Sequence, residues 1–287
     1  MPDNTPHLSS TVSYDSYIQR MYAAVLLIIV FIIMLAFYFL SQSRIQSVAL
    51  AEARTRNLSQ VLAQNVGGTI DKINLVLLTS ADSIEKQLAT ASLERLPLEP
   101  FLIREHHYVP ELNRMLVVNS VGEIIAGSGK NFPRANVVNR DYFIALRDNP
   151  DLKLAISKPV AGVIDGKWIQ VYARRISGPD GSFAGVITGS LSLDHFINDF
   201  SVIKMGEFGS ITLRDKDLAV IARYPVPSEA GSSVGKSIVA GEFKELIASG
   251  KTSATYRAIY PVDNIERVYT YYKIADYPIY ILSLIHI

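Results

Sequence analysis

The chain has 287 residues, and its 28 lysines and arginines nearly balance its 27 aspartates and glutamates, which leaves a formal net charge of +1. Bulk electrostatics therefore gives no attraction to nucleic acid, and no basic stripe with interleaved aromatic residues is present, so we expect no nucleic-acid partner. The absence of cysteine excludes disulfides, thiolate zinc sites and cysteine nucleophiles, and it fits a bacterial extracytoplasmic domain.

The longest apolar segment, from Tyr22 to Leu40, contains 19 residues without a charge. A hydrocarbon core ~30 Å thick needs about 20 apolar residues in a helix, and backbone groups in lipid must bond internally. We therefore predict a transmembrane helix over residues 20–41. A cleaved signal peptide is a poor alternative, because the apolar run is too long and no small-residue cleavage site follows it. A buried core helix of this length is unusual.

The polar residues before this helix, 1–19, are predicted to form a short disordered tail on the cytoplasmic side. Charge bears only weakly on the orientation. Three arginines follow the helix (Arg44, Arg54 and Arg56), whereas one precedes it (Arg20). This excess of positive charge after the helix would by itself place the C-terminal part inside the cell. Long domains translocate largely regardless of charge, so this signal carries little weight.

Residues 42–95 are predicted to form a long stalk helix. Gly67 and Gly68 each weaken a helix by about 1 kcal/mol relative to alanine, so we expect a bend or a close contact there. Pairing with a second chain over residues 44–65, which would make a homodimer, is a further hypothesis. Apolar residues recur at steps of three and four and form one helical stripe, whose members are Leu58, Leu62, Val66, Ile70, Ile73, Leu77, Ala81, Ile84 and Leu88.

Residues 96–204 alternate strand and helix signals. Two apolar runs flank a turn at residues 120–122 and predict a hairpin, and a turn at residues 178–181 joins two further alternating runs. Short helices are expected near residues 139–150 and 193–203. Roughly five strands with helical insertions predict an α+β module around an antiparallel sheet.

Period-two alternation assigns residues to the two faces of this sheet. We expect the apolar faces of its strands to cover the stripe of the long helix. The polar and aromatic faces are predicted to line a ligand pocket, with a simple solvated face as the alternative. The residues assigned to the pocket side are Trp168, Gln170, Tyr172 and Arg174 on one strand and Thr188, Ser190 and Ser192 on the next.

Residues 205–281 repeat the strand–helix–strand order and predict a second, smaller module. The tyrosines of its last two strands favour strand packing over a binding role. Strands are expected within GSITLRD, LAVIARYP, KTSATYRAIY, ERVYTYYKI and YPIYI, with a helix near GEFKELIAS.

No catalytic constellation is visible in the sequence. It contains no P-loop, GxSxG, HExxH or EF-hand pattern, and GSSVGK (Gly231–Lys236) is too short for a phosphate-binding loop. His106 and His107 are adjacent, so on a helix they cannot form an i,i+4 metal pair. We therefore predict no catalytic residue, no metal and no cofactor, and an enzyme is the minority interpretation.

The segments NRDYFIALRDNP, ISKPV and W-x-x-x-x-A-R-R-I, followed by DG-x-F-x-G-V, resemble the double Cache (dCache) sensor domains of bacterial transmembrane receptors. The resemblance covers about residues 41–281. It implies an α+β fold in which two PAS-like antiparallel-sheet modules stack on one long helix. The ligand pocket would lie in the membrane-distal module, residues 96–204, and residues 205–281 would form the membrane-proximal module.

The same resemblance implies a sensor anchored in the bacterial inner membrane with its domain on the periplasmic or extracellular side. It also implies a second membrane helix and a cytoplasmic output domain of the diguanylate cyclase, histidine kinase or chemoreceptor type. Residues 282–287, LSLIHI, are similar to the translation of a transposon end used as a sequencing adapter. We interpret them as an artefact joined to a gene truncated before its output domain, and we exclude them from fold prediction.

Amino-acid-sensing members of this family share an Arg-x-aromatic-aromatic motif for the ligand carboxylate, which Arg140, Tyr142 and Phe143 match. The planar guanidinium of arginine can bind a carboxylate bidentately. A structural ion pair of Arg140 with Asp141, or with another carboxylate, is the alternative. The predicted ligand-binding residues are Arg140, Asp141, Tyr142, Phe143, Trp168, Gln170, Tyr172, Arg174, Thr188 and Ser190.

The resemblance fails where those family members hold the ligand ammonium with tyrosine and aspartate side chains. Val160, Gly162 and Ser190 stand at the corresponding positions. We therefore expect a small-molecule ligand that is anionic or neutral, such as an organic acid, and not an α-amino acid. An anchored extracytoplasmic enzyme and a structural or partner-binding stalk are the alternative functions.

Overall fold

The computed structural model describes residues 11–129, 132, 134–162, 166–205, 209–227, 233–259 and 266–286. The chain divides into two compact units, Met1–Ala51 and Glu52–Ile287. Helix α1 (Thr11–Leu88) contributes residues to both units.

The first unit consists of the N-terminal part of α1. Its large apolar side chains from Tyr22 to Leu40 are exposed. Within the described residues, α1 is the one helix long and apolar enough to cross a membrane, and the mean hydropathy of its apolar segment is 3.1. This length and composition fit the predicted membrane span.

The predicted disordered tail is wrong for residues 11–19, which belong to α1. The remainder of that tail, residues 1–10, lies outside the described residues. A helix extends one hydrogen bond at a time from a formed segment, and no proline or glycine interrupts residues 11–19. The apolar helix therefore continues through polar residues that would not form a helix alone.

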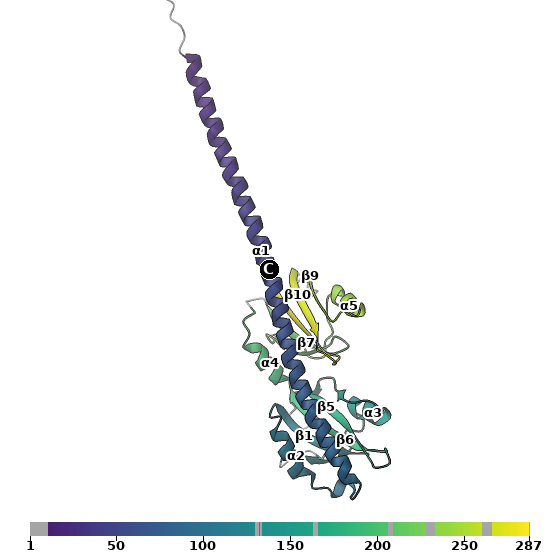
Figure 1. Cartoon of the computed structure of the whole chain (residues 1–287). Coiled ribbons are helices and arrows are strands. Elements are labelled where there is room, and N and C mark those ends of the chain that lie inside the picture. Colours follow the sequence, from purple (N-terminus) through teal and green to yellow (C-terminus); the bar gives the residue numbers. More distant parts are fainter. Residues whose placement is uncertain are drawn as a thin grey trace, which may run out of the picture. The chain divides into compact units, whose positions relative to one another are not determined.

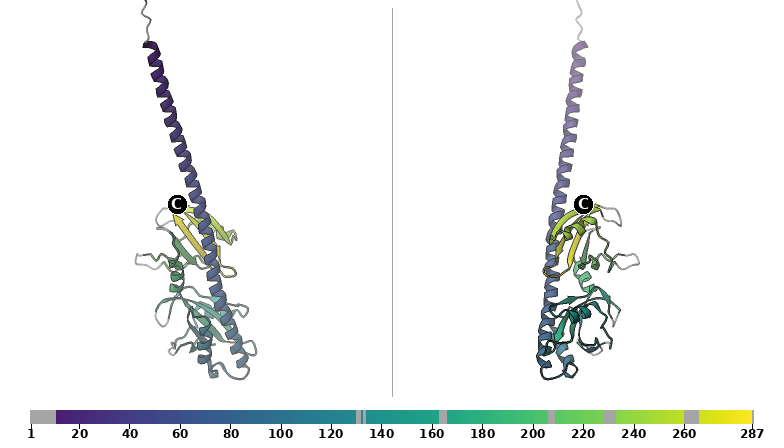
Figure 2. Two further views of the ribbon diagram at one scale, coloured as in Figure 1. Left: turned by 60° about the vertical axis from the view of Figure 1, so that its left-hand side comes forward. Right: turned by 90° about the vertical axis from the view of Figure 1, so that its right-hand side faces the viewer.

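In the second unit, α1 carries the predicted apolar stripe into the core. Ile70, Ile73, Leu77 and Ile84 have no exposed surface, and their core includes side chains from both sheets of the unit. Figures 1 and 2 show this part of α1 running past both sheets. A bend or a close contact was predicted at Gly67 and Gly68, and the structure shows a close contact at Gly67. A Cβ atom at this position would lie 3.3 Å from Cγ2 of Ile274.

The first module is built on a six-stranded antiparallel sheet with the order β2-β1-β6-β5-β3, and β4 pairs with β5. The pairing of β1 with β2 confirms the predicted hairpin. Its strands are β1 (Leu112–Asn119), β2 (Ile124–Gly127), β3 (Ala155–Ile156), β4 (Val160–Ala161), β5 (Trp168–Ser177) and β6 (Phe183–Ser192). Its helices are the 3-10 turn η1 (Leu93–Arg95), α2 (Leu98–His107), α3 (Asp141–Asp148) and α4 (Leu193–Ser201).

The two faces of this sheet belong to different cores. One face packs against α1. The other face packs against α3 through a smaller core that contains Phe143, Leu146, Val171 and Ala173. Each strand therefore sends alternate side chains toward α1 and toward α3.

The second module repeats this arrangement with five strands in the order β8-β7-β11-β10-β9. Counted within the module, the order is 2-1-5-4-3, and the first sheet has the same order with β4 as an addition. The predicted repeat of an α+β module is thus confirmed. Its elements are β7 (Ser210–Arg214), β8 (Val220–Tyr224), α5 (Gly241–Ala248), β9 (Ser253–Ile259), β10 (Glu266–Lys273) and β11 (Tyr280–His286).

The exclusion of residues 282–287 from the fold is wrong for residues 282–286, because these residues belong to strand β11. Residues 282–286 lie in the middle of the second sheet, where β11 pairs with both β7 and β10; residue 287 lies outside the described residues. A strand with two neighbours has partners for its backbone groups on both edges. The side chains of this strand also alternate as expected for a strand between two cores. Leu282 and Leu284 face one side of the sheet, and the buried Ser283 faces the other side, where it hydrogen-bonds Ser59 of α1.

Candidate functional site

The first module contains a cavity of about 670 Å³ on the face of its sheet opposite α1. Its wall combines apolar side chains, such as Leu116, Val118 and Val171, with charged and hydroxyl groups. A concave site of this size with a few polar groups is typical of small-molecule binding. The polar and charged residues that line it are Glu111, Asn113, Arg114, Arg140, Tyr142, Lys167, Thr188, Ser190, Ser192, Asp194, His195 and Asn198.

Strand β6 lines the cavity as the alternation predicted. Thr188, Ser190 and Ser192 all face it, while Ile187 and Leu191 lie in the core with α1. The hydroxyl of Ser190 donates to the carbonyl oxygen of Arg114 over 3.4 Å. These hydroxyls are suited to orient a polar ligand.

Strand β5 reverses the prediction for Gln170, Tyr172 and Arg174, because these residues lie on the face toward α1. Tyr172 is fully buried in the core with α1, and its hydroxyl donates to Oε1 of Gln170 over 2.9 Å. The Arg174 Nη1 donates to Oδ1 of Asn74 on α1 over 2.6 Å. The β5 side chains that line the cavity are Ile169 and Val171.

The register between β5 and β6 explains this correction. Val171 lies opposite Ser190, and Tyr172 lies opposite Gly189. Directly opposite residues of an antiparallel pair point to the same face, so Val171 must share the cavity face with Ser190. A buried tyrosine or arginine on the helix face is stable when its polar end is hydrogen-bonded, as it is for Tyr172 and Arg174.

Trp168, also predicted at the pocket, lies elsewhere. Its side chain is 45% exposed and borders a separate cavity of about 260 Å³ with Leu193, Ile197 and Val226. That cavity lies where α4 meets the second module. Trp168 therefore belongs to the junction between the modules, and the predicted pocket does not include it.

Arg140 lines the cavity and caps α3. Its carbonyl oxygen accepts from the backbone N–H of Phe143 over 3.1 Å, which fixes the residue at the start of the helix. No hydrogen bond or ion pair joins its half-buried guanidinium to any residue that the structure describes. Asp141 is exposed, and its Oδ1 accepts from the backbone N–H of Tyr142 over 2.8 Å, so the alternative ion pair between Arg140 and Asp141 does not form.

The two aromatic residues of the Arg-x-aromatic-aromatic motif lie in different environments. Tyr142 lines the cavity with Arg140. Burial raises the pKa of Tyr142 to about 12 against the opposing effect of the Arg140 charge, so its hydroxyl stays neutral and can donate a hydrogen bond. Phe143 instead lies in the core beneath α3, where its ring meets Phe183 edge-on at 5.3 Å between centroids. Phe143 therefore positions α3 and does not reach the cavity.

Sequence reasoning missed several charged residues of the cavity. Arg114 stands in the middle of β1, at steps of two from Leu116 and Val118, and all three face the cavity. An arginine on the inward face of an otherwise apolar strand was the available signal. Glu111 was not detectable because its position follows the end of α2 and depends on an ion pair with Lys72 of α1, at 2.7 Å.

The charge of Glu111 is maintained by this ion pair. Burial raises its pKa, but the hydrogen bond from Lys72, a backbone hydrogen bond and the charges of Lys72 and His195 together lower the pKa below the ordinary value of 4.5. Its Oε2 is buried and makes no hydrogen bond to any described residue. The cavity therefore combines the cations Arg114, Arg140 and Lys167 with the anions Glu111 and Asp194.

The three positions that correspond to an ammonium cage in amino-acid sensors do border the cavity. Val160, Gly162 and Ser190 all line it, and none carries a carboxylate. The carboxylate of Asp194 lies instead at the exposed start of α4.

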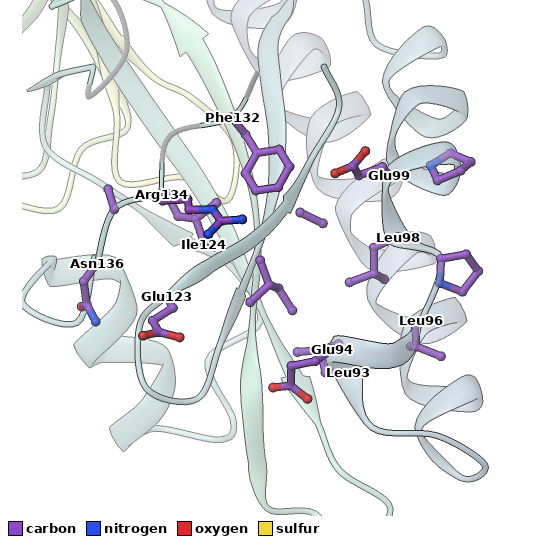
Figure 3. A pocket seen from close by; sticks show the side chains of 15 residues that line it. Leu93, Glu94, Leu96, Leu98, Glu99, Glu123, Ile124, Phe132, Arg134 and Asn136 are labelled. Carbon is purple, nitrogen blue, oxygen red and sulfur yellow. The ribbon is translucent and has the colours of Figure 1, made fainter. Parts of the chain in front are cut away.

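A second, larger hollow of about 760 Å³ lies at the edge of the first module. Figure 3 shows that its side chains come from η1 and the start of α2, from β2 and the residue before it, and from the loop that follows β2. It carries Glu94, Glu99 and Glu123 against Arg134 and includes none of the predicted site residues. The cavity that holds Arg140 is therefore the better candidate for the ligand.

No protein-family model matches the sequence, and no curated protein matches it. Solved extracellular domains do match the structure. The extracellular domain of rpHK1S-Z16, assigned as a histidine kinase, gives a TM-score of 0.73 at 23% identity, with 84% of this chain and 96% of that domain covered. The extracellular domain of mmHK1S-Z2, also assigned as a histidine kinase, gives a TM-score of 0.64 at 13% identity. The match covers 82% of this chain and 97% of that domain.

The chain is also similar to the ligand-binding domain of the chemoreceptor CtaA from Pseudomonas fluorescens in complex with L-isoleucine. This similarity has a TM-score of 0.62 at 17% identity and covers 85% of this chain and 95% of that domain. At these identities the likeness establishes the fold. The chain therefore shares the fold of these extracellular and ligand-binding domains, and the fold predicted from the dCache resemblance is confirmed.

Proposed function

We propose that this chain is a membrane-anchored extracytoplasmic sensor, which binds a small molecule in the cavity of the first module and passes the signal through α1 to a cytoplasmic output domain. The observation that carries the proposal is the guanidinium of Arg140, half-buried in a 670 Å³ cavity and without an ion-pair partner among the described residues. The shared fold with extracellular domains of chemoreceptors and histidine kinases supports it.

The ligand that this cavity favours is a small organic acid. Arg140 and Arg114 supply two half-buried guanidinium groups, which match carboxylate geometry. The hydroxyls of Tyr142, Thr188 and Ser190 add neutral hydrogen-bonding groups. The positions that bind the ligand ammonium in amino-acid sensors carry no charged side chain here, since they are occupied by Val160, Gly162 and Ser190. The ammonium group of an α-amino acid would therefore lose its hydration at these positions without gaining an ion pair.

The route for a signal is the sheet itself. The cavity lies on one face, and α1 packs on the other. A ligand shifts a two-state equilibrium only by its differential affinity for the two states, typically about 1–3 kcal/mol of coupling. A change in the spacing of β5 and β6 would move Tyr172 and Leu191, which contact the core with α1. We propose that a homodimer and an inner-membrane anchor complete the receptor.

The enzyme alternative is weaker. The similar structures are an extracellular domain of a histidine kinase and a ligand-binding domain of a chemoreceptor, which lend the enzyme alternative no support. The stalk alternative is weakened by the cavity, since a purely structural module would fill that face with its own side chains.

The test is ligand binding by the full chain in lipid nanodiscs, measured by calorimetry. Matched probes that differ only in the ammonium group, succinate against L-aspartate and propionate against L-alanine, separate the ligand classes. We expect an organic acid to bind more tightly than its amino analogue. Arg140→Ala should lower that affinity at least tenfold, because it removes a charge-assisted hydrogen-bond pair.

The matched control is Arg147→Ala, which removes an exposed arginine from the same helix, where it pairs with Asp148 at 2.7 Å outside the cavity. This variant should retain the affinity of the unmodified chain. Unchanged affinity in Arg140→Ala would refute the site, and tighter binding of the amino analogues would refute the ligand class.

A further inference from the structure

Helix α4 lies between the cavity of the first module and the junction cavity, the hollow of about 260 Å³ where α4 meets the second module. His195 and Asn198, three residues apart, line the cavity of the first module. Leu193 and Ile197, four residues apart, line the junction cavity, and Asp194 borders both. Residues three or four apart share one face of a helix, so α4 presents one face to each cavity.

The start of β5 separates the same two cavities. Lys167 and Ile169 line the cavity of the first module, and Trp168, between them in the chain, borders the junction cavity. Successive side chains of an extended segment point to opposite sides, which accounts for this alternation. The two cavities therefore share a wall that consists of α4 and the first residues of β5.

Strand β6 continues into α4 without a loop. Ser192 ends β6, lines the cavity of the first module and caps the helix, since its Oγ accepts from the backbone N–H of Asp194 over 3.2 Å. Phe196 and Phe200 hold α4 in the core that it shares with α1, and their rings stack at 6.5 Å between centroids. No loop residue is present at this joint to absorb a displacement of the cavity wall.

The opposite face of α4 meets the second module. The helix contacts β8, and the junction cavity is bounded on that side by Arg223 of β8 and by Val226 just after it. Leu193 lies in the same core as Ile221 and Ala222 of β8, and all three side chains are buried. Figure 1 shows α4 beside both modules.

We propose that α4 transmits occupancy of the first-module cavity to β8, as a branch of the signal separate from α1. A molecule bound against His195 and Asn198 displaces one face of the helix, and Ile197 on the other face passes the displacement to the second module. Close-packed interiors transmit such strain because they are hardly compressible. The proposal rests on the sensor function proposed above, and it names the contact through which the second module is regulated.

The test places a covalent occupant in the first-module cavity of the full chain in lipid nanodiscs. The chain has no cysteine, so a thiol reagent modifies only an introduced one. Ser190→Cys places the thiol at a half-buried position of the cavity wall. Benzyl methanethiosulfonate fills the cavity, and methyl methanethiosulfonate adds little volume. Asn113→Cys, at an exposed position of the same wall, takes the label if labelled Ser190→Cys does not fold.

Amide hydrogen exchange of β8, measured by mass spectrometry, is the decisive readout, because the described residues of β8 do not line the first-module cavity. We expect the benzyl label to change the exchange rate of β8 by about fivefold or more, the lower end of typical coupling between sites, and the methyl label to change it less. The emission of Trp168, the one tryptophan of the chain, should shift as well. Val121→Cys is the control for the label, since Val121 is 59% exposed and lies outside both cavities.

Ile197→Ala tests the helix contact itself. It removes the side chain that α4 directs to the junction cavity. The matched control is Val202→Ala, which shortens an apolar side chain just after α4 that is 81% exposed and lines neither cavity. A thermal melt of each variant verifies folding. If Ile197→Ala does not fold, Val226→Ala replaces it, because Val226 borders the junction cavity from the other side and is 60% exposed.

Loss of the benzyl effect on β8 in Ile197→Ala, with the effect kept in Val202→Ala, supports the role of α4. Unchanged exchange of β8 after benzyl labelling overturns it. An effect that persists in folded Ile197→Ala, that is lost equally in Val202→Ala or that labelled Val121→Cys reproduces also overturns it. The label is not the ligand, so these results are independent of the calorimetry with organic acids, and a failure of this proposal is distinguishable from a failure of the proposed function.

Discussion

At the residue scale, the two arginines among the predicted ligand-binding residues, Arg140 and Arg174, have opposite environments. Arg140 borders the cavity of the first module. Arg174 packs toward α1, where burial lowers its pKa against the raising effects of Asp82, Tyr277 and Glu85, and its Nη1 donates to Asn74. One residue type therefore lines a cavity on one face of the sheet and packs against the helix on the other.

Glu111 gives a pH-dependent prediction. Its pKa is lower in the folded chain than the ordinary 4.5, so its ionised form stabilises the fold above about pH 4.5, and this contribution is lost as the pH falls through the folded-state pKa. We expect the difference in unfolding free energy between the unmodified chain and Glu111→Gln to be constant at neutral pH and to shrink below pH 4.5.

The measurement is urea unfolding of the full chain in detergent micelles across this pH range. Lys72→Met serves as the companion variant, because Lys72 is the charged partner of Glu111. In that background the pH dependence assigned to Glu111 should weaken. A difference that grows as the pH falls below 4.5 would contradict the assignment.

At the element scale, α1 uses different side chains against its two sheets. Small residues, Ser59 and Gly67, meet the second module, where Ser59 hydrogen-bonds Ser283 and Gly67 approaches Ile274. Larger residues such as Ile73, Leu77 and Ile84 extend the shared core farther along the helix. The small residues let a helix and a strand approach closely, and the large ones fill a wider gap.

Leu77 and Leu75 allow a matched test of the stripe. Leu77 is fully buried and Leu75 is 59% exposed, although they are two residues apart on one helix. Leu77→Ala should lower the unfolding free energy by about 2–5 kcal/mol, because it leaves a cavity in the core. Leu75→Ala should change it by less than about 0.5 kcal/mol. Equal effects of the two variants in urea unfolding would contradict the packing described here.

At the scale of the whole molecule, the two modules of the second unit are joined by more than their connecting chain. The hydroxyl of Tyr277, from the second module, donates to Oδ1 of Asp71 on α1 over 2.6 Å. Asn74, less than one helical turn further along α1, accepts from Arg174 of the first module. Lys158 and Asp217 add an exposed ion pair between the modules at 3.0 Å, which contributes about 0–1 kcal/mol.

The predicted membrane span gives a prediction at the same scale. Lysine at the centre of a membrane helix costs about 3 kcal/mol per residue for insertion. Ile29→Lys combined with Ile33→Lys should therefore move the chain out of the carbonate-resistant membrane fraction. The control pair, Ile45→Lys with Leu50→Lys, changes exposed residues beyond the apolar segment and should leave the chain in that fraction. Retention of the first double variant would argue against the span.

The sequence by itself determined the elements and their kinds. The apolar segment from Tyr22 to Leu40, the stripe of α1, the hairpin of β1 with β2 and the repeat of two modules follow from local periodicity and turn residues, which depend on near neighbours in the chain. Arg140 was identified differently, from the resemblance to dCache sensor domains, whose Arg-x-aromatic-aromatic motif is contiguous in the chain. It lines the cavity as predicted, and its role in binding stays a prediction.

Tertiary structure decided which face of each strand became the pocket. Strand β5 alternates between two buried faces, so its own pattern does not say which face meets α1, and the pairing of Val171 with Ser190 settles it. Glu111 and Arg114, just before and within β1, and Lys167, just before β5, reach the same cavity from two segments far apart in the chain. The placement of residues 282–286 in the second sheet depends likewise on β7 and β10. These outcomes depend on register and long-range pairing, which local periodicity does not contain.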